Sequence, residues 1–181
     1  MPVSKSKKKE AVFYIVLGVL LISLFVGYRL NRARILSFAG TPGNASVSGL
    51  SKPVSIEIPS LKVSLAVEEA AIKNGIWQIS PKNVSHLETS AVPGQGGKIV
   101  IYGHNKASIL GNLRLIKVGE KIYLKNQSGK IYSYMVEKTV VVSPKEIQYV
   151  EKTSEEVLTL YTCTGLFDSQ RFVVIAGPLS N

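Results

Sequence analysis

The chain has 181 residues, a length that fits one catalytic domain with accessory segments, and a formal net charge of +10. Six of the ten charges flank a single apolar segment, so residues 35–181 carry only +4. The lysines of this part are scattered, without a stripe of aromatic residues for stacking bases, which argues against a nucleic-acid partner.

A basic tail and an apolar segment open the chain. Residues 1–10 carry +3, residues 11–28 are uncharged and mainly apolar, and Arg29, Arg32 and Arg34 follow them. An 18-residue helix covers about 27 Å, just enough to cross a bilayer. The N-terminal side of this segment carries slightly more positive residues than the C-terminal side. The positive-inside rule therefore predicts a cytoplasmic tail and an extracellular C-terminal part.

A cleaved secretory signal is the alternative for this region, because such signals also begin with lysines and an apolar stretch. Their apolar core is usually shorter, and a small-x-small cleavage site follows it. Here arginines follow instead, which favours an uncleaved transmembrane anchor at 11–28. Either an uncleaved anchor or a cleaved signal would place the rest of the chain outside the membrane.

A flexible linker is expected at residues 29–53, since 37–53 are rich in Ser, Gly, Ala and Pro without an apolar period. The folded domain is therefore expected at 54–181. Its helical periodicity is weak, with 107–116 as the one candidate helix. Short segments rich in Val, Ile and Tyr predict the strands 54–59, 61–67, 98–104, 121–126, 130–142, 157–163 and 171–177. Such strands with brief connections predict an antiparallel sandwich or barrel.

Cys163 is the single cysteine, and it ends the predicted strand 157–163. A lone cysteine is most often a small buried hydrophobe, so its context decides its interpretation. That context, Thr-Leu-Tyr-Thr-Cys at 159–163, resembles the Thr-Leu-x-Thr-Cys signature of the sortases. Arg171 follows eight positions later and opens the next predicted strand, as in that family.

His104 closes another predicted strand, about 60 residues before the cysteine. A single histidine is more often structural than catalytic. Its Gly-His pair at a strand end resembles the sortase histidine element, and Ile58–Leu61 (Ile-Pro-Ser-Leu) resembles the opening strand of that family. The resemblance covers roughly residues 54–179.

The resemblance implies a mainly β protein: a closed sortase-like barrel of about eight strands with short helices, preceded by one N-terminal transmembrane helix. It implies a catalytic set of Cys163, His104 and Arg171. The thiolate would attack an amide carbonyl, the imidazolium would protonate the leaving amine, and the guanidinium would support the oxyanion. Secreted surface proteins with a Leu-Pro-x-Thr-Gly-like sorting motif would be cleaved through a thioester. The acyl group would pass to an amine acceptor of the cell wall or a pilin.

Metal ligands are scarce in this chain. One cysteine and two histidines cannot build a zinc site without several carboxylates, and Asp168 is the only aspartate, which excludes an Asp-x-Asp-x-Asp calcium loop. A calcium site built from glutamates stays open. We expect no cofactor and no metal.

The second histidine, His86, matches no family element, so we expect His86 to be a solvent-facing loop residue.

Two features depart from common sortase patterns. Tyr161 stands where many relatives have a smaller aliphatic residue, and the connection from 142 to 157 is short, which leaves the sorting motif open.

Alternative functions for this chain are a membrane-tethered, non-catalytic β binding module and a cysteine peptidase that only hydrolyses. A serine hydrolase is excluded by the absence of a Gly-x-Ser-x-Gly elbow. Gly94–Gly97 precedes a predicted strand, so it is a turn and no dinucleotide fingerprint.

Overall fold

The computed structural model describes residues 5–35, 37–38 and 52–179, and the chain divides into two compact units, Met1–Ala33 and Arg34–Asn181. The helices, with η marking 3-10 helices, are α1 (Lys5–Ile35), η1 (Pro59–Leu61), η2 (Leu113–Leu115), η3 (Ile147–Tyr149) and η4 (Leu166–Asp168). The strands are β1 (Pro53–Ile58), β2 (Val63–Ala70), β3 (Ile72–Lys73), β4 (Ile76–Trp77), β5 (Val84–Leu87), β6 (Lys98–Gly103), β7 (Lys121–Asn126), β8 (Ile131–Val142), β9 (Val157–Thr164) and β10 (Gln170–Pro178).

Helix α1 is 31 residues long and contains the apolar segment that the sequence predicts as an anchor. Lys9–Gly27 has a mean hydropathy of 2.3 and none of it is buried within the protein. A helix that is apolar on all sides needs an apolar surrounding. By length and composition this stretch is therefore able to cross a membrane.

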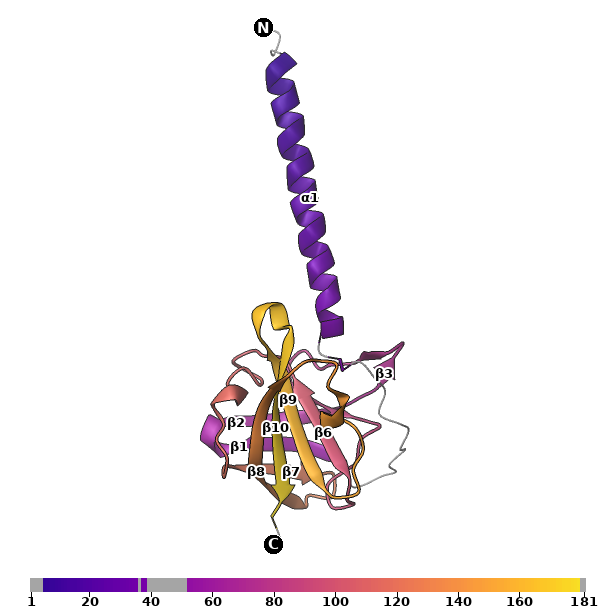
Figure 1. Ribbon diagram of the computed structural model, residues 1–181, viewed down its shortest axis with the longest axis vertical. Coiled ribbons are helices and arrows are strands. Elements are labelled where there is room, and N and C mark those ends of the chain that lie inside the picture. Colours follow the sequence, from indigo (N-terminus) through magenta and orange to yellow (C-terminus); the bar gives the residue numbers. More distant parts are fainter. Residues whose placement is uncertain (1–4, 36, 39–51, 180–181) are drawn as a thin grey trace. The chain divides into compact units, whose positions relative to one another are not determined.

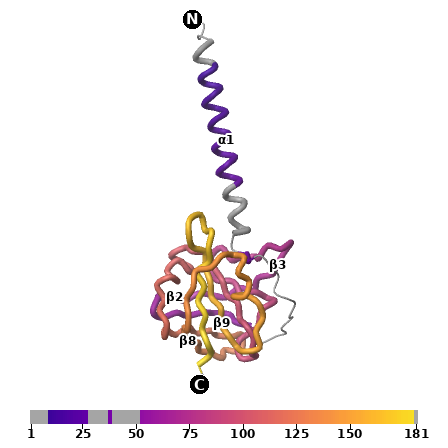
Figure 2. Tube along the Cα trace, viewed as in Figure 1, coloured from indigo at the N-terminus to yellow at the C-terminus, as the bar shows by residue number. Residues whose placement is uncertain are grey.

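Eight strands of the described chain close into a barrel in the order β1-β2-β5-β6-β9-β10-β8-β7, and β3 and β4 form a separate hairpin. Figure 1 shows β6, β9, β10 and β8 side by side, and the course of the chain through them can be followed in Figure 2. The closed eight-stranded barrel expected from the resemblance is confirmed. The expectation of a purely antiparallel arrangement is wrong, since β2 pairs with β5 and β6 with β9 in parallel.

The barrel strands bury side chains on both faces. Along β6, Ile99 and Ile101 point into the barrel, whereas Val100 and Tyr102 lie on its outer face, as the two-residue repeat of a strand requires. The inner face builds the barrel core, which includes Ile56, Ile58, Val84, Ile99, Ile101, Leu124, Tyr134, Leu158, Leu160 and Val174. The outer face of one wall carries a second set, here called the outer cluster: Phe38, Ala70, Trp77, Leu87, Val100, Tyr102, Val142, Val150, Tyr161, Cys163 and Val173.

The predicted strands differ from the observed ones mainly at their ends. Strand β2 begins at Val63 because Pro59–Leu61 forms a 3-10 turn that Lys62 ends with a left-handed φ of 54°. The candidate helix 107–116 is wrong, as this stretch forms turns followed by η2. A Cβ on Gly111 would lie 2.6 Å from the carbonyl carbon of Lys106, so the turn folds back too closely for a helix.

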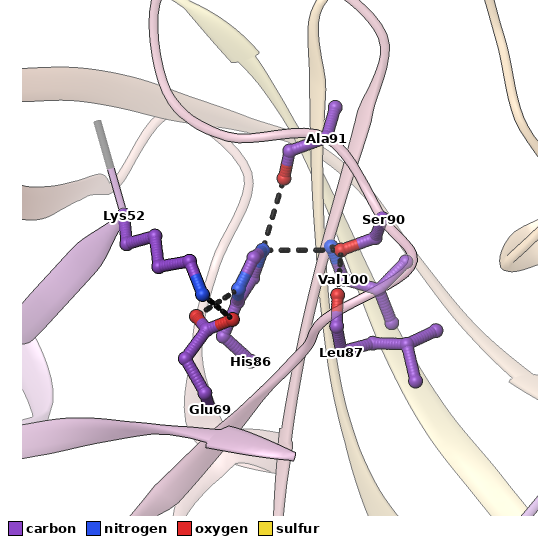
Figure 3. A network of polar contacts seen from close by, with 7 residues as sticks. All are labelled: Lys52, Glu69, His86, Leu87, Ser90, Ala91 and Val100. Atoms are coloured by element: carbon purple, nitrogen blue, oxygen red, sulfur yellow. Dashed lines mark hydrogen bonds and ion pairs between the residues drawn. The ribbon is translucent and has the colours of Figure 1, made fainter. Parts of the chain in front are cut away.

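His86 corrects another expectation, since it lies in β5 and is only 1% exposed. Its Nδ1 lies 2.6 Å from a carboxylate oxygen of Glu69, which also pairs with Lys52 at 3.1 Å. On the other side, Nε2 lies 2.9 Å from the carbonyl oxygen of Ala91 and 3.1 Å from the hydroxyl of Ser90 (Figure 3). The imidazole therefore joins β2, β5 and the following turn, and sequence context misled because β5 is only four residues long.

Glu69 makes this network dependent on pH. Burial raises the pKa of its carboxyl, but the hydrogen bonds and charges of His86 and Lys52 outweigh burial, so the pKa lies below its usual value. A carboxyl with a depressed pKa stabilises the fold above its unfolded pKa of about 4.3, and this contribution disappears as pH falls through the folded pKa.

We therefore expect Glu69→Gln to lower the free energy of unfolding at pH 7 by about 2 kcal/mol, because the mutation removes a partly buried, charge-assisted acceptor. The difference from the wild type should begin to shrink below the unfolded pKa of about 4.3 and disappear as pH falls through the depressed folded pKa, where the folded wild-type carboxyl is itself protonated. Urea denaturation of the detergent-solubilised full chain across this pH range measures this. Glu68→Gln, on the exposed side of the same strand, is the matched control, and an equal loss in both variants would contradict the role of Glu69.

Candidate active site

Strands β6, β9 and β10 lie side by side in the barrel (Figure 1). Their register brings the backbones of the three predicted site residues to one edge of the sheet. Cys163 of β9 pairs directly with Arg171 of β10 in antiparallel register. Facing residues of such a pair have Cα atoms about 4.5–5.5 Å apart and side chains on the same face. On the other side of β9, Thr162 pairs with Gly103, the last residue of β6, and His104 follows at once. Cys163 therefore lies between His104 and Arg171.

Close backbone packing fixes the end of β6. The hydroxyl of Thr162 donates to the carbonyl oxygen of Gly103 at 2.8 Å, which ties the ends of β6 and β9 together. A Cβ on Gly103 would lie 3.0–3.1 Å from the side chains of Ile109 and Leu110, so a larger residue would push this turn away. The amide of Leu110 donates to the carbonyl oxygen of His104 at 3.1 Å, which holds the histidine backbone beside the strand end.

Cys163 is 5% exposed and faces two different surroundings. It belongs to the apolar outer cluster, and it also lines a mainly polar pocket of about 160 Å³. The other residues that line this pocket are Asn105, Gly111, Arg114, Thr162, Thr164, Gly165 and Phe172. A nucleophile between an apolar cluster and a polar pocket can meet two different reactants.

Arg171 is a buried cation, 1% exposed. Its Nη1 donates to the carbonyl oxygens of Asp168 at 3.1 Å and Gln170 at 3.0 Å, and its Nη2 donates to that of Ser37 at 3.2 Å. Among the described residues, its Nε has no hydrogen-bond partner. A buried donor without a partner is costly, so this N–H is poised to meet an acceptor brought by a ligand.

The loop between β9 and β10 holds an unusual backbone. Phe167 and Asp168 have φ values of 54° and 61°, in the left-handed region that ordinary residues rarely adopt and that costs about 1–3 kcal/mol each. The side-chain amide of Asn105 donates to the Asp168 carboxylate at 2.6 Å. Asn105 directly follows His104, so this bond connects the histidine loop to the loop that positions Arg171. Sequence analysis assigned no role to Asn105.

Stacked aromatic rings support β6 and β9 beneath the site. The rings of Tyr102 and Tyr161 stack with centroids 5.4 Å apart, and Trp77 meets both edge-on. Burial raises the pKa of both phenols well above the usual value. The Tyr102 hydroxyl donates to the carbonyl oxygen of Gln78 at 2.5 Å. Both tyrosines therefore stay neutral near pH 7 and serve as a rigid floor, which explains how the large Tyr161 is accommodated.

In the part of the chain that the structure describes, no three His, Cys, Asp or Glu residues gather as they would around an ion. A cysteine whose strand lies between a strand that carries an arginine and one that ends at a histidine suits covalent catalysis by a thiol.

Comparison with known proteins gives one consistent family. A family model described as a sortase domain matches residues 56–179. Sortase A of Bacillus anthracis is 28% identical over 127 residues, which cover 68% of this chain and 58% of that protein. The chain thus spans less than two thirds of this relative. The crystal structure of sortase C-1 from Actinomyces oris matches with a TM-score of 0.60 at 28% identity, covering 72% of this chain and 76% of that one. A pilus-related sortase C of Group B Streptococcus shares the fold, with a TM-score of 0.63 at 22% identity over 81% of this chain and 80% of its own.

Thr162→Val tests the bond between β6 and β9, since valine keeps the shape of threonine but cannot donate to Gly103. We expect a loss of about 1–2 kcal/mol in the free energy of unfolding, because a buried carbonyl loses its donor. Urea denaturation of the full chain in detergent measures it. Thr164→Val, two residues later on the same strand and more exposed, should stay within about 0.5 kcal/mol of the wild type. Similar losses in both variants would show that the bond contributes nothing particular.

Proposed function

Because the chain belongs to the sortase family, we propose that it is a membrane-anchored cysteine transpeptidase with Cys163, His104 and Arg171 as its catalytic residues. The observation that carries this proposal is the register of β9, which pairs with β10 at Cys163 and with β6 next to His104. Residues at adjacent strand ends are placed so that their side chains could converge, which the proposed acid, base and nucleophilic chemistry requires.

In the proposed reaction, the Cys163 thiolate attacks the carbonyl carbon of a peptide bond in the donor. The C–N bond of the tetrahedral intermediate then breaks, His104 gives its proton to the departing amine, and a thioester remains on the sulfur. An acceptor amine attacks the thioester, loses a proton to His104, and releases the thiolate. Bonds and protons balance over the cycle, so no cofactor is needed.

Arg171 would stabilise the oxyanion of both tetrahedral intermediates. Its guanidinium keeps its charge at any working pH, and its Nε–H is a buried donor, unpaired among the described residues, on the strand that pairs with Cys163. Its other hydrogen bonds go to backbone carbonyls, which orient the planar group before the substrate arrives. Such preorganised donors are worth more in a site that excludes water.

The two surroundings of Cys163 support a reaction with two substrates. The donor peptide would approach over the apolar outer cluster, and the acceptor amine would enter the polar pocket with Asn105 and Arg114. A sorting motif of the Leu-Pro-x-Thr-Gly kind in secreted surface proteins is the donor that the family suggests. A cell-wall amine or a pilin is the acceptor, and the resemblance to a pilus-related sortase C favours testing pilins first.

Helix α1 would anchor this enzyme as a single membrane span, with residues 1–10 in the cytoplasm and the barrel outside the cell. This orientation brings the active site to surface proteins as they leave the membrane. Accessibility of engineered cysteines on either side of α1, in a Cys163→Ala background, tests the topology.

Cys163→Ala should abolish both the thioester and the transfer while leaving the fold intact, because no other residue can replace the sulfur. Mass spectrometry of the full chain incubated with a peptide library detects the acyl-enzyme and identifies the preferred motif. Hydroxylamine, a small amine nucleophile, should convert the wild-type thioester to a hydroxamate. Transfer that persists without the sulfur would exclude the mechanism, and products of hydrolysis alone, with amines present, would indicate a peptidase.

Arg171→Lys keeps the positive charge but removes the planar fork of donors, so we expect kcat to fall by about 100-fold or more. Arg114→Lys makes the same change on the polar pocket, away from the strand pairing with Cys163, and should cost less. Steady-state kinetics with the peptide found above measures both. An unchanged kcat for Arg171→Lys would remove Arg171 from the proposed catalytic set.

A further inference from the structure

Asn105 directly follows His104 and lines the polar pocket together with Cys163. Its side-chain amide has two different ends, a donor Nδ2 and an acceptor Oδ1. Nδ2 donates to a carboxylate oxygen of Asp168 at 2.6 Å. Because an ionised carboxylate can only accept hydrogen bonds, the chemistry of Asp168 decides which end of the amide faces it. The carbonyl oxygen Oδ1 therefore lies at the end of the amide that is turned away from Asp168.

Asp168 is itself held by the β9–β10 loop. Its backbone has a left-handed φ of 61°, and its amide donates to the carbonyl oxygen of Gly165 at 3.2 Å. Its own carbonyl oxygen accepts from Nη1 of Arg171 at 3.1 Å. The carboxylate that orients Asn105 thus belongs to a residue whose backbone is fixed at both its amide and its carbonyl.

The other polar side chains of the pocket offer an incoming amine less. Arg114 has only N–H donors. The hydroxyl of Thr162 already gives its proton to the carbonyl oxygen of Gly103, and the hydroxyl of Thr164 can rotate about its bond. An acceptor whose direction is set in advance costs no reorganisation when the substrate arrives. The Oδ1 of Asn105 is such an acceptor.

The proton balance of the transfer step shows what this acceptor would bind. A neutral primary amine carries two N–H groups when its nitrogen attacks the thioester carbon. As the C–N bond forms and the C–S bond breaks, one of these protons passes to His104 and the thiolate leaves. The other hydrogen stays on the nitrogen and becomes the N–H of the new amide. An acceptor on the residue next to His104 is in the right part of the chain to hold it.

We propose that Asn105 Oδ1 accepts a hydrogen bond from this second N–H, that Asp168 is a positioning residue for the Asn105 amide, and that the pair selects primary over secondary amines. The inference rests on the proposed function and deepens it by assigning the chemical class of the acceptor. A secondary amine has a single N–H, which is lost to His104, so it has no hydrogen left for Asn105. The positive charge of Arg114 at the pocket disfavours an ammonium ion and so favours the neutral amine, which is the form that attacks.

The first test compares two acceptors on one acyl-enzyme. The full chain in detergent micelles is loaded with a donor peptide that forms the thioester, and either glycinamide or its N-methyl relative sarcosinamide is added. Mass spectrometry of the products measures aminolysis and hydrolysis separately. The wild type should use glycinamide about 10-fold faster than sarcosinamide or more, because only glycinamide keeps a hydrogen for Asn105.

Asn105→Ala should slow the reaction with glycinamide by about 10-fold and leave the reaction with sarcosinamide nearly unchanged, so that the preference for the primary amine disappears. The rate of thioester formation should stay at the wild-type value, since the donor is attacked before the amine enters. A variant that merely displaced His104 would slow both amines and thioester formation together. An undiminished preference for glycinamide in Asn105→Ala would overturn the inference.

Exchange of the two side chains tests the role of Asp168. Asp168→Asn keeps a residue type that tolerates a left-handed backbone, but either end of its amide can face Asn105, so the preference for glycinamide should fall a few-fold. The double variant Asn105→Asp with Asp168→Asn again fixes one donor between the two residues and leaves a carboxylate oxygen for the amine. It should recover most of the preference. Failure of the exchange to recover it would remove Asp168 from the proposal.

Asn112→Ala is the matched control, because it removes an exposed asparagine side chain that is not among the described residues lining the pocket. It should keep the wild-type preference. Thermal melting identifies any variant whose barrel is unfolded.

Two outcomes separate this inference from the proposed function. A thioester that forms in all variants and reacts with the two amines in the same ratio throughout would refute the role of Asn105 and leave the transpeptidase standing. The absence of a thioester from the wild type as well as from the variants, with folded barrels, would refute the proposed function and the inference that rests on it.

Discussion

The register of β9 between β6 and β10 is the constraint on which the rest of the site depends. Side chains alternate along β9, so that Leu158 and Leu160 fill the barrel while Tyr161 and Cys163 lie on the outer face with Val173 of β10. A slip of one residue would turn the sulfur into the barrel core and carry an aliphatic side chain outward. The dense packing on both faces makes this register the only one that buries both sets of side chains.

Arg171 shows how the fold holds a cation that it buries. A carboxylate partner would lower the cost of burial, but it would also neutralise the charge that a developing oxyanion needs. The hydrogen bonds from its Nη atoms go instead to the backbone carbonyls of Asp168 in the strained β9–β10 loop, of Gln170 at the start of β10, and of Ser37. The left-handed backbone of Phe167 and Asp168 turns the Asp168 carbonyl toward the guanidinium.

Much of the barrel was predictable because its long strands are rich in β-branched and aromatic residues; the bounds of β7 match the prediction, and those of β8 and β9 differ by one residue. Strand β5 was missed because its four residues are buried on both faces and pair in parallel with β2, which leaves no alternating pattern. The motifs pointed to Cys163, His104 and Arg171, and the structure brings them to neighbouring strand ends. Nothing local pointed to the burial of Phe38, because its ring contacts the distant Trp77 and Tyr161.

The parallel pairing of β6 with β9 has a consequence for how this protein matures. Gly103 and Thr162 are 59 positions apart, and closure of the barrel also joins β1 to β7 across a long stretch of chain. Pairings of such high contact order form slowly, because the loop entropy must be overcome before the contacts stabilise. Until then the sulfur is an ordinary thiol on an unfolded chain, open to any oxidants that are present, and with no second cysteine in the sequence it has no disulfide partner within the molecule. The speed of folding therefore sets how many copies of the chain keep a reduced thiol at Cys163.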